Sequence, residues 1–175
     1  DYGVEKNIKL LADAKNMKIS DLNACVLKRP RHEEIVRSLI KMNVKINFIS
    51  DGDIAGVLSV IGEEPKNDIY YSTGGGPEGV LAAAALSCYG GQIQGRLVLN
   101  EEEKIRAKKL GIKDFKKKYY IEDMIKGDVI FCATGITSGD LAKGVQDLGN
   151  EYEVTTFALH KSKKIKKIVS NIYNK

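Results

Sequence analysis

The strongest constraint on the fold is an alternation of predicted strands and helices along the chain. Residues 24–28, 44–50 and 67–73 are short apolar runs typical of buried strands, and residues 2–17 have the three- and four-residue apolar spacing of a helix. Further strands are predicted at 91–99, 128–137 and 152–160, and further helices after Pro30 and at 77–90, 100–111 and 120–127. This order predicts a single α/β domain over residues 1–175, with a mainly parallel or mixed sheet sandwiched between helices in three αβα layers.

Composition and length are those of a compact soluble protein. Hydrophobic residues make up 43% and charged residues 29% of the 175 residues, as in ordinary globular domains. The longest apolar run, residues 80–86, is far shorter than the roughly 20 residues that span a bilayer, and no signal peptide is recognisable. Cys25, Cys88 and Cys132 lie in apolar surroundings, which indicates a reducing cytoplasm and no zinc site. We therefore expect a cytoplasmic protein with no membrane partner.

The net charge of +5 comes from one end of the chain. The last fifteen residues hold six lysines and no acid, so the remaining 160 sum to about −1. A basic tail of this kind, rather than a basic groove, argues against nucleic acid as a partner.

Polar clusters follow four of the predicted strands. They are "KRPRH" after residues 24–28, "SDGD" after 44–50, "TGGGPEG" after 67–73 and "TGITSGD" after 128–133. Ligands of open α/β sheets bind at the carboxyl ends of the strands. The sequence therefore predicts one site, built from four loops on one edge of the sheet.

The glycine-rich loop before the helix at 77–90 is suited to an anion. Its glycines let the backbone come close to a ligand, and the N–H groups of a helix start favour phosphate, although a tight turn would use the same residues. Glu78 lies in the first helical turn, where the helix dipole alone would stabilise it. Beside a bound phosphate, however, a carboxylate is repulsive unless a divalent cation lies between them, which makes Glu78 a candidate metal ligand.

Arginines and aspartates fill the other two loops. Arg29 and Arg31 flank Pro30, and their guanidinium groups can hold phosphate oxygens or remain solvated. Asp51 and Asp53, on either side of Gly52, can form a turn, bind a metal or accept hydrogen bonds from sugar hydroxyls, and their spacing does not decide between these. The two histidines have weaker claims: we read His32 as a helix-start residue and His160 as a surface residue.

Taken in order, "KRPRH", "SDGD", "GGGPEGVLAAAAL", "GGQIQGRL" and "GDVIFCATGIT" resemble the C-terminal half of the class II fructose-1,6-bisphosphatases, bacterial members of the metal-dependent, lithium-sensitive sugar phosphatase superfamily. The resemblance implies that Arg29, Pro30 and Arg31 line a phosphate pocket, that Asp51, Gly52 and Asp53 hold the sugar, that Gly75 contacts substrate through its backbone, and that Glu78 binds Mn²⁺ or Mg²⁺. It also implies hydrolysis of the 1-phosphate of fructose 1,6-bisphosphate to fructose 6-phosphate and phosphate, a step of gluconeogenesis.

The same resemblance implies a missing part. Family members are close to twice this long, and their N-terminal half supplies most metal carboxylates and the residues that activate water. We therefore expect a fragment of a longer enzyme, nearly inert alone, whose partners are fructose 1,6-bisphosphate, the N-terminal half of the same enzyme and, at full length, further copies in a homo-oligomer. The alternative from another class is a nucleotide- or dinucleotide-binding module in which Asp51 grips a ribose.

Overall fold

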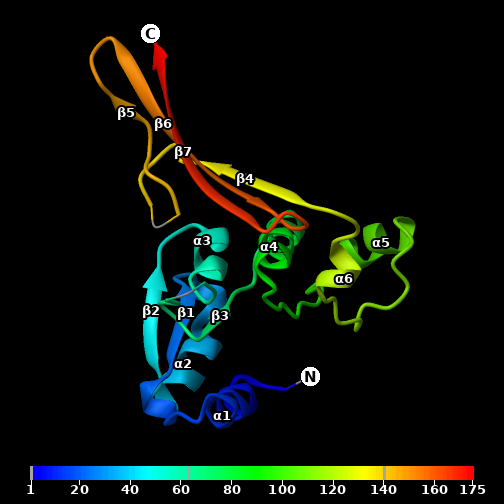
Figure 1. Ribbon diagram of the computed structural model, residues 1–175. Helices are drawn as coiled ribbons and strands as arrows, with labels where there is room; N and C mark the ends of the chain where they lie inside the picture. The colour runs from blue at the N-terminus through cyan, green and yellow to red at the C-terminus, as the bar shows by residue number, and fades with distance from the viewer. Residues whose placement is uncertain (1, 63, 140) are drawn as a thin grey trace.

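A three-stranded parallel sheet forms the first half of the molecule. The computed structural model describes residues 2–62, 64–139 and 141–175. Strands β1 (Asn23–Leu27), β2 (Lys45–Ile49) and β3 (Ile69–Tyr71) lie in the order β2-β1-β3 (Figure 1). All three predicted strands are confirmed, and β1 pairs in parallel with both neighbours.

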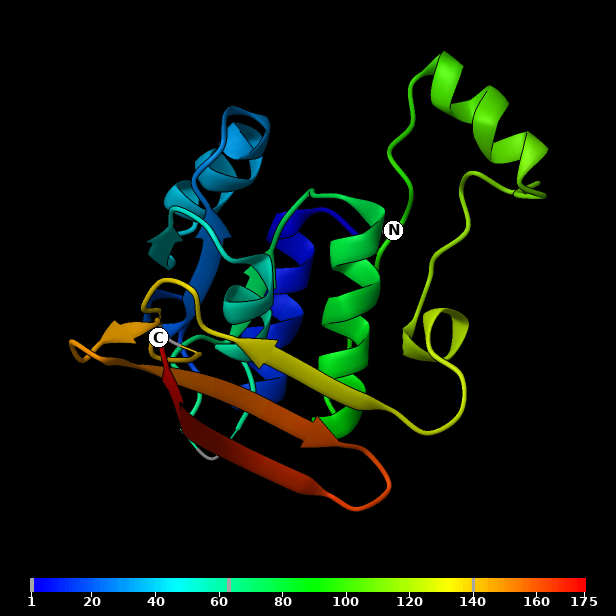
Figure 2. The ribbon, with the colours of Figure 1, turned by 90° about the horizontal axis from the view of Figure 1, so that it is seen from above.

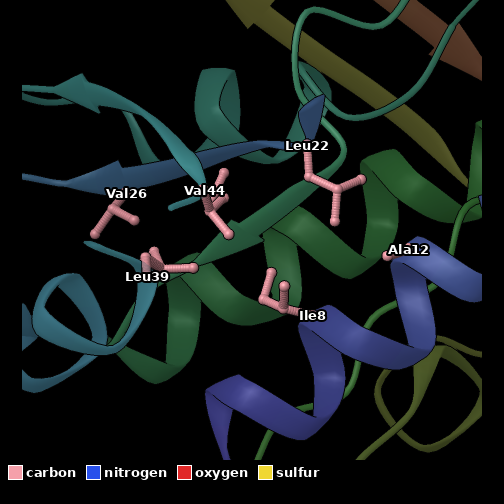
Figure 3. Close-up of a cluster of buried hydrophobic side chains, with 7 residues drawn as sticks. Ile8, Ala12, Leu22, Val26, Leu39 and Val44 are labelled. Carbon is pink, nitrogen blue, oxygen red and sulfur yellow. The ribbon is translucent and has the colours of Figure 1, made fainter. Parts of the chain in front are cut away.

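Helices cover both faces of this sheet, as predicted. On one face, α1 (Val4–Lys15) and α2 (Glu33–Lys41) bury Ile8 and Leu39 against Ala24 and Val26 of β1. Figure 3 shows this cluster between the two helices and the sheet. The other face is covered by α3 (Asp53–Leu58) and α4 (Gly76–Tyr89). Since β1 is buried on both faces, its sequence reads as a continuous apolar run.

Close contact between α3 and the sheet depends on a glycine. A Cβ built on Gly56 would lie 2.5 Å from the ring of Tyr70 and 2.8 Å from Cδ1 of Ile49. Any larger residue would therefore push α3 away from β2 and β3.

A second, antiparallel sheet packs on the far side of α4. It contains β4 (Ile130–Thr134), β5 (Gln146–Asp147), β6 (Glu151–His160) and β7 (Ile165–Asn174), with β6 paired to the other three. Phe131 and Phe157 of this sheet pack against Ala85 of α4. Helix α4 therefore lies between two sheets, a layer that the sequence pattern did not predict (Figure 2).

The prediction that "TGITSGD" follows a strand of the parallel sheet is wrong. The loop follows β4, which pairs antiparallel with β6 and belongs to the second sheet. The loop still approaches the first region, because Leu141 packs on the apolar cluster that Ile54 of α3 also joins. Asp140, the acid of this motif, lies outside the described residues.

The segment between α4 and β4 carries two further helices, α5 (Glu101–Lys109) and α6 (Ile121–Met124), both as predicted. The strand predicted at 91–99 is wrong, because this segment makes only an isolated bridge between Gly95 and Tyr119. The basic tail is not a tail: residues 165–174 are strand β7, paired with β6 along its whole length. Among the described residues, no helix is long and apolar enough to cross a bilayer.

Candidate functional site

Three polar loops meet at the carboxyl edge of the parallel sheet. They are residues 28–32 after β1, residues 50–53 after β2 and residues 72–78 after β3. Because the three strands are parallel neighbours, their carboxyl ends lie at the same edge. Every candidate site residue from the sequence lies in one of these loops.

The two arginines bridge from the first loop to the other two. One Nη of Arg29 donates to the carbonyl of Ser50 at 2.7 Å and to that of Lys28 at 2.9 Å. Nε of Arg31 donates to the carbonyl of Thr73. Pro30, between them, begins a short 3₁₀ turn (Pro30–His32), where its missing N–H costs nothing. Each guanidinium keeps further N–H groups for an anion, since arginine has five.

The second loop presents its two aspartates differently. Oδ1 of Asp51 accepts from the N–H of Gly52 at 2.8 Å, and Gly52 has φ +85°, which favours glycine. Oδ1 of Asp53, at the start of α3, accepts from the Tyr70 hydroxyl at 2.6 Å and from the Ser72 hydroxyl at 2.8 Å. Asp51 thus shapes the turn, while Asp53 is bonded to β3 and the loop after it.

Burial and the Asp53 carboxylate both raise the pKa of the Tyr70 hydroxyl well above its usual range. Tyr70 therefore stays protonated at neutral pH and keeps donating to Asp53. This bond orients the carboxylate and leaves Oδ2 of Asp53 available to a ligand.

The third loop brings the set together. A Cβ built on Gly74 would lie 3.7 Å from both carboxylate oxygens of Asp53, and one built on Gly75 would collide with the carboxylate of Glu78. Residues 73, 74 and 75 are therefore approached in turn by the side chains of Arg31, Asp53 and Glu78. Arg31 and Asp53 reach this segment from loops distant in sequence, and Glu78 folds back onto it from the first turn of α4.

Sequence reasoning missed the role of His32. It does precede α2, as predicted, but its ring is completely buried and hydrogen-bonded to Leu27 and Thr73. The only signal was its position directly after "RPR", and helical or strand periodicity says nothing about such a residue.

A divalent metal would find part of its ligands here. Within residues 2–62, 64–139 and 141–175, no group of three or more His, Cys, Asp and Glu side chains lies together as a potential metal site. Glu78 is exposed at the edge, with a carboxylate that can serve as one ligand. Mg²⁺ prefers about six oxygens, so water, substrate phosphate and other protein groups would have to supply the rest.

An α/β sheet edge with two arginines, two aspartates and a glycine-rich helix start is typical of proteins that bind phosphorylated small molecules. The comparison with known sequences is more specific: the model of the family described as bacterial fructose-1,6-bisphosphatase, glpX-encoded, matches residues 1–173. The chain belongs to this family.

Curated relatives agree with this assignment. The chain is 34% identical over 189 residues to the D-fructose 1,6-bisphosphatase class 2/sedoheptulose 1,7-bisphosphatase of a Synechococcus strain, covering 100% of this chain and 54% of that protein. It is 36% identical over 186 residues to the fructose-1,6-bisphosphatase class 2 of Haemophilus influenzae, covering 97% of this chain and 56% of that protein. The chain thus spans about half the length of the curated relatives it matches.

Proposed function

We propose that this chain is the substrate-binding half of a class II fructose-1,6-bisphosphatase, which hydrolyses the 1-phosphate of fructose 1,6-bisphosphate to fructose 6-phosphate and phosphate. The observation that carries the proposal is the convergence of Arg31, Asp53 and Glu78 on residues 73–75. A bisphosphorylated sugar needs cationic donors for its phosphates and acceptors for its hydroxyls, and this edge offers both.

In this proposal each loop has its own task. Arg29 and Arg31, held apart by Pro30, donate to phosphate oxygens with the N–H groups that the carbonyls of Ser50 and Thr73 leave unused. Asp51 and Asp53 accept from sugar hydroxyls, and Gly52 lets their loop approach the ring. Gly75 contacts the substrate with its backbone, as the absence of a side chain allows.

Glu78 is proposed as the single metal ligand of this chain, for Mn²⁺ or Mg²⁺. When bound, such an ion neutralises phosphate charge and lowers the pKa of a bound water. Glu78 holds its carboxylate over Gly75 at the start of α4, beside the segment that the arginines and Asp53 approach.

We also propose that the remaining metal carboxylates come from an N-terminal half of the enzyme, which covers the outer face of the second sheet. Directly paired residues share a face. Phe131 and Leu159 are paired and buried toward α4, so their neighbours Ile130 and Ile165 point outward, where they are 70% and 47% exposed.

The outer face has little charge for a surface meant to contact water. Across β4, β6 and β7 it consists of Ile130, Cys132, Thr134, Tyr152, Val154, Thr156, Ala158, His160, Ile165, Lys167, Val169, Asn171 and Tyr173. Only one of these residues is a lysine, and none is an acid. A solvated antiparallel sheet normally alternates apolar and polar faces. An outer face with a single charged residue, in a chain about half as long as its relatives, favours the rest of the enzyme as its cover.

Calorimetric titration of the chain with fructose 1,6-bisphosphate in the presence of Mg²⁺ tests the proposal. We expect binding that weakens at least about tenfold in Arg31→Ala, because one or two charge-assisted hydrogen bonds are lost. The matched control is Arg106→Ala, which removes an exposed arginine of α5, outside the three loops. ATP and NAD serve as competitors: binding of either nucleotide without binding of the sugar would favour the nucleotide-binding alternative.

Activity tests the assignment of Glu78. Adding an N-terminal half from the same family is expected to restore phosphate release, and Glu78→Gln is expected to abolish it while leaving the fold intact. Full activity of Glu78→Gln in the reconstituted enzyme would remove Glu78 from the metal site.

A further inference from the structure

His32 occupies an unusual position at the candidate site. It ends the 3₁₀ turn that carries Pro30 and Arg31, and it directly precedes α2. Although the loops around it are polar and partly exposed, its side chain is completely buried. A buried imidazole needs partners for both ring nitrogens, because an unpaired one is costly.

Both nitrogens have partners, and the partners determine the tautomer. Nδ1 lies 2.6 Å from the carbonyl oxygen of Leu27, which can only accept, so Nδ1 carries the proton. The N–H of Thr73, which can only donate, lies 2.8 Å from Nε2, closer than the Thr73 carbonyl oxygen at 3.3 Å, so Nε2 is the acceptor. The ring therefore links the end of β1 to the loop after β3, where Thr73 lies 41 residues beyond His32 in the chain.

Two residues that are neighbours in the chain, Arg31 and His32, hydrogen-bond to the two backbone polar groups of Thr73. Its N–H donates to Nε2 of His32, and its carbonyl accepts from Nε of Arg31. The next two residues, Gly74 and Gly75, lack side chains that would hold their backbone in place. Asp53 approaches the first glycine and Glu78 the second.

We propose that His32 is a positioning residue for residues 73–75: by accepting from the Thr73 N–H it sets this segment relative to Arg31, Asp53 and Glu78. It touches no substrate and acts through Thr73. This inference rests on the function proposed above. It identifies His32 as the group that orders the glycine loop before a phosphorylated ligand binds.

Two substitutions separate the hydrogen bonds of the ring. The amide nitrogen of an asparagine side chain reaches the place of Nδ1 but leaves Thr73 without an acceptor. The carbonyl oxygen of a glutamine side chain reaches the place of Nε2 and can accept from Thr73. His32→Asn and His32→Gln each keep one bond and lose the other.

The experiment is calorimetric titration of the 175-residue chain and both variants with fructose 1,6-bisphosphate and Mg²⁺, together with thermal unfolding. We expect His32→Asn to bind about tenfold more weakly and His32→Gln to stay within about threefold of the unsubstituted chain, while both lose similar thermal stability. His160→Asn, in the second sheet, is the matched control and should bind normally. If His32 only stabilised the fold, the affinity for the bisphosphate would fall together with thermal stability in both variants. Equal affinities of His32→Asn and His32→Gln would therefore overturn the proposal.

Nitrogen NMR of the unsubstituted chain gives an independent readout that holds even if both variants unfold. Long-range ¹H–¹⁵N correlations should show the Nδ1–H tautomer of His32, and the Thr73 amide should be protected from exchange. The Nε2–H tautomer, or a rapidly exchanging Thr73 amide, would overturn the proposal. If the unsubstituted chain binds no bisphosphate, the proposed function fails instead, while this NMR result still decides whether His32 holds the segment.

Discussion

The parallel and antiparallel sheets of this molecule differ in how far the chain buries them. In the parallel sheet, Ala24, Cys25 and Val26 of β1 are completely buried, because helices from the same chain cover both faces. In the antiparallel sheet, α4 covers one face only, and every residue of β7 except Val169 is exposed. The candidate site lies on the sheet that is closed on both sides.

This difference in burial indicates which of the two sheets contributes more to the stability of the fold. Apolar area removed from water stabilises a fold at about 25 cal/mol per Å², so the parallel sheet has a complete core and the β6–β7 hairpin does not. The hairpin relies on backbone pairing and on one apolar face. We therefore expect the parallel region to dominate stability.

The largest expected effect comes from the same leucine truncation in the two regions. Leu39→Ala, in the buried cluster under the parallel sheet, should lower the free energy of unfolding by about 2–5 kcal/mol. Leu148→Ala, at an exposed position beside β5, should change it by no more than about 0.5 kcal/mol. Urea denaturation measures both, and similar losses would contradict the proposed division of stability.

A smaller effect separates two glycines in helices. Gly56→Ala should destabilise the chain by about 1–3 kcal/mol, because the new methyl group meets Tyr70 and Ile49. Gly79→Ala, in α4 with no atom within 4 Å of the added carbon, should stabilise it by about 0.5–1 kcal/mol through helix propensity. Thermal melts of the two variants should move in opposite directions, and a shift in the same direction would disprove the close contact at Gly56.

The smallest expected effects concern stability at low pH. Burial acts to raise the pKa of Asp68, but the Lys15 ammonium and the Asn23 N–H outweigh it, so the pKa is lowered. Hydrogen bonds from Ser162 and then His160 hold the pKa of Asp128 well below its usual range. A lowered pKa contributes stability that is present above the unfolded value, near pH 4, and is lost as pH falls through the folded value.

The two aspartates should therefore differ in how far their effect reaches. Asp68→Asn should reduce the loss of global stability between about pH 5 and pH 2, since the carboxylate joins α1 to the parallel sheet. Asp128→Asn should mainly speed amide exchange of Ser162, whose N–H it binds at the β6–β7 turn. Urea midpoints across this pH range and hydrogen exchange measure the two effects. Global acid sensitivity that depends on Asp128 alone would reverse the comparison.

The elements of the parallel region were predictable because their patterns are strong and local. Short apolar runs marked its three strands, and Pro77 with Gly90 marked both ends of α4, where Gly90 has φ +77°. The convergence of its three loops followed from the rule that parallel strands end at one edge. That Asp53 is bonded to Tyr70, by contrast, depends on side-chain directions that spacing does not determine.

The antiparallel region was harder to predict for physical reasons. Lysines interrupt the apolar residues of β7, so residues 165–174 looked like a charged tail until β6 supplied a pairing partner. The opposite error occurred at 91–99, where an apolar pattern finds no strand to pair with except at Gly95. His32 was missed because its partners lie 5 and 41 residues away.

The position of α4 has a consequence for how this protein can vary. Ala82, Ala83 and Ala85 are buried along a helix that touches both sheets, and its first turn carries Glu78. These methyl groups act as spacers that determine how closely the sheets approach. A bulkier residue at any of these three alanine positions would tilt α4 and move the Glu78 carboxylate in its first turn. A substitution far from the ligand would then change how tightly the site binds it.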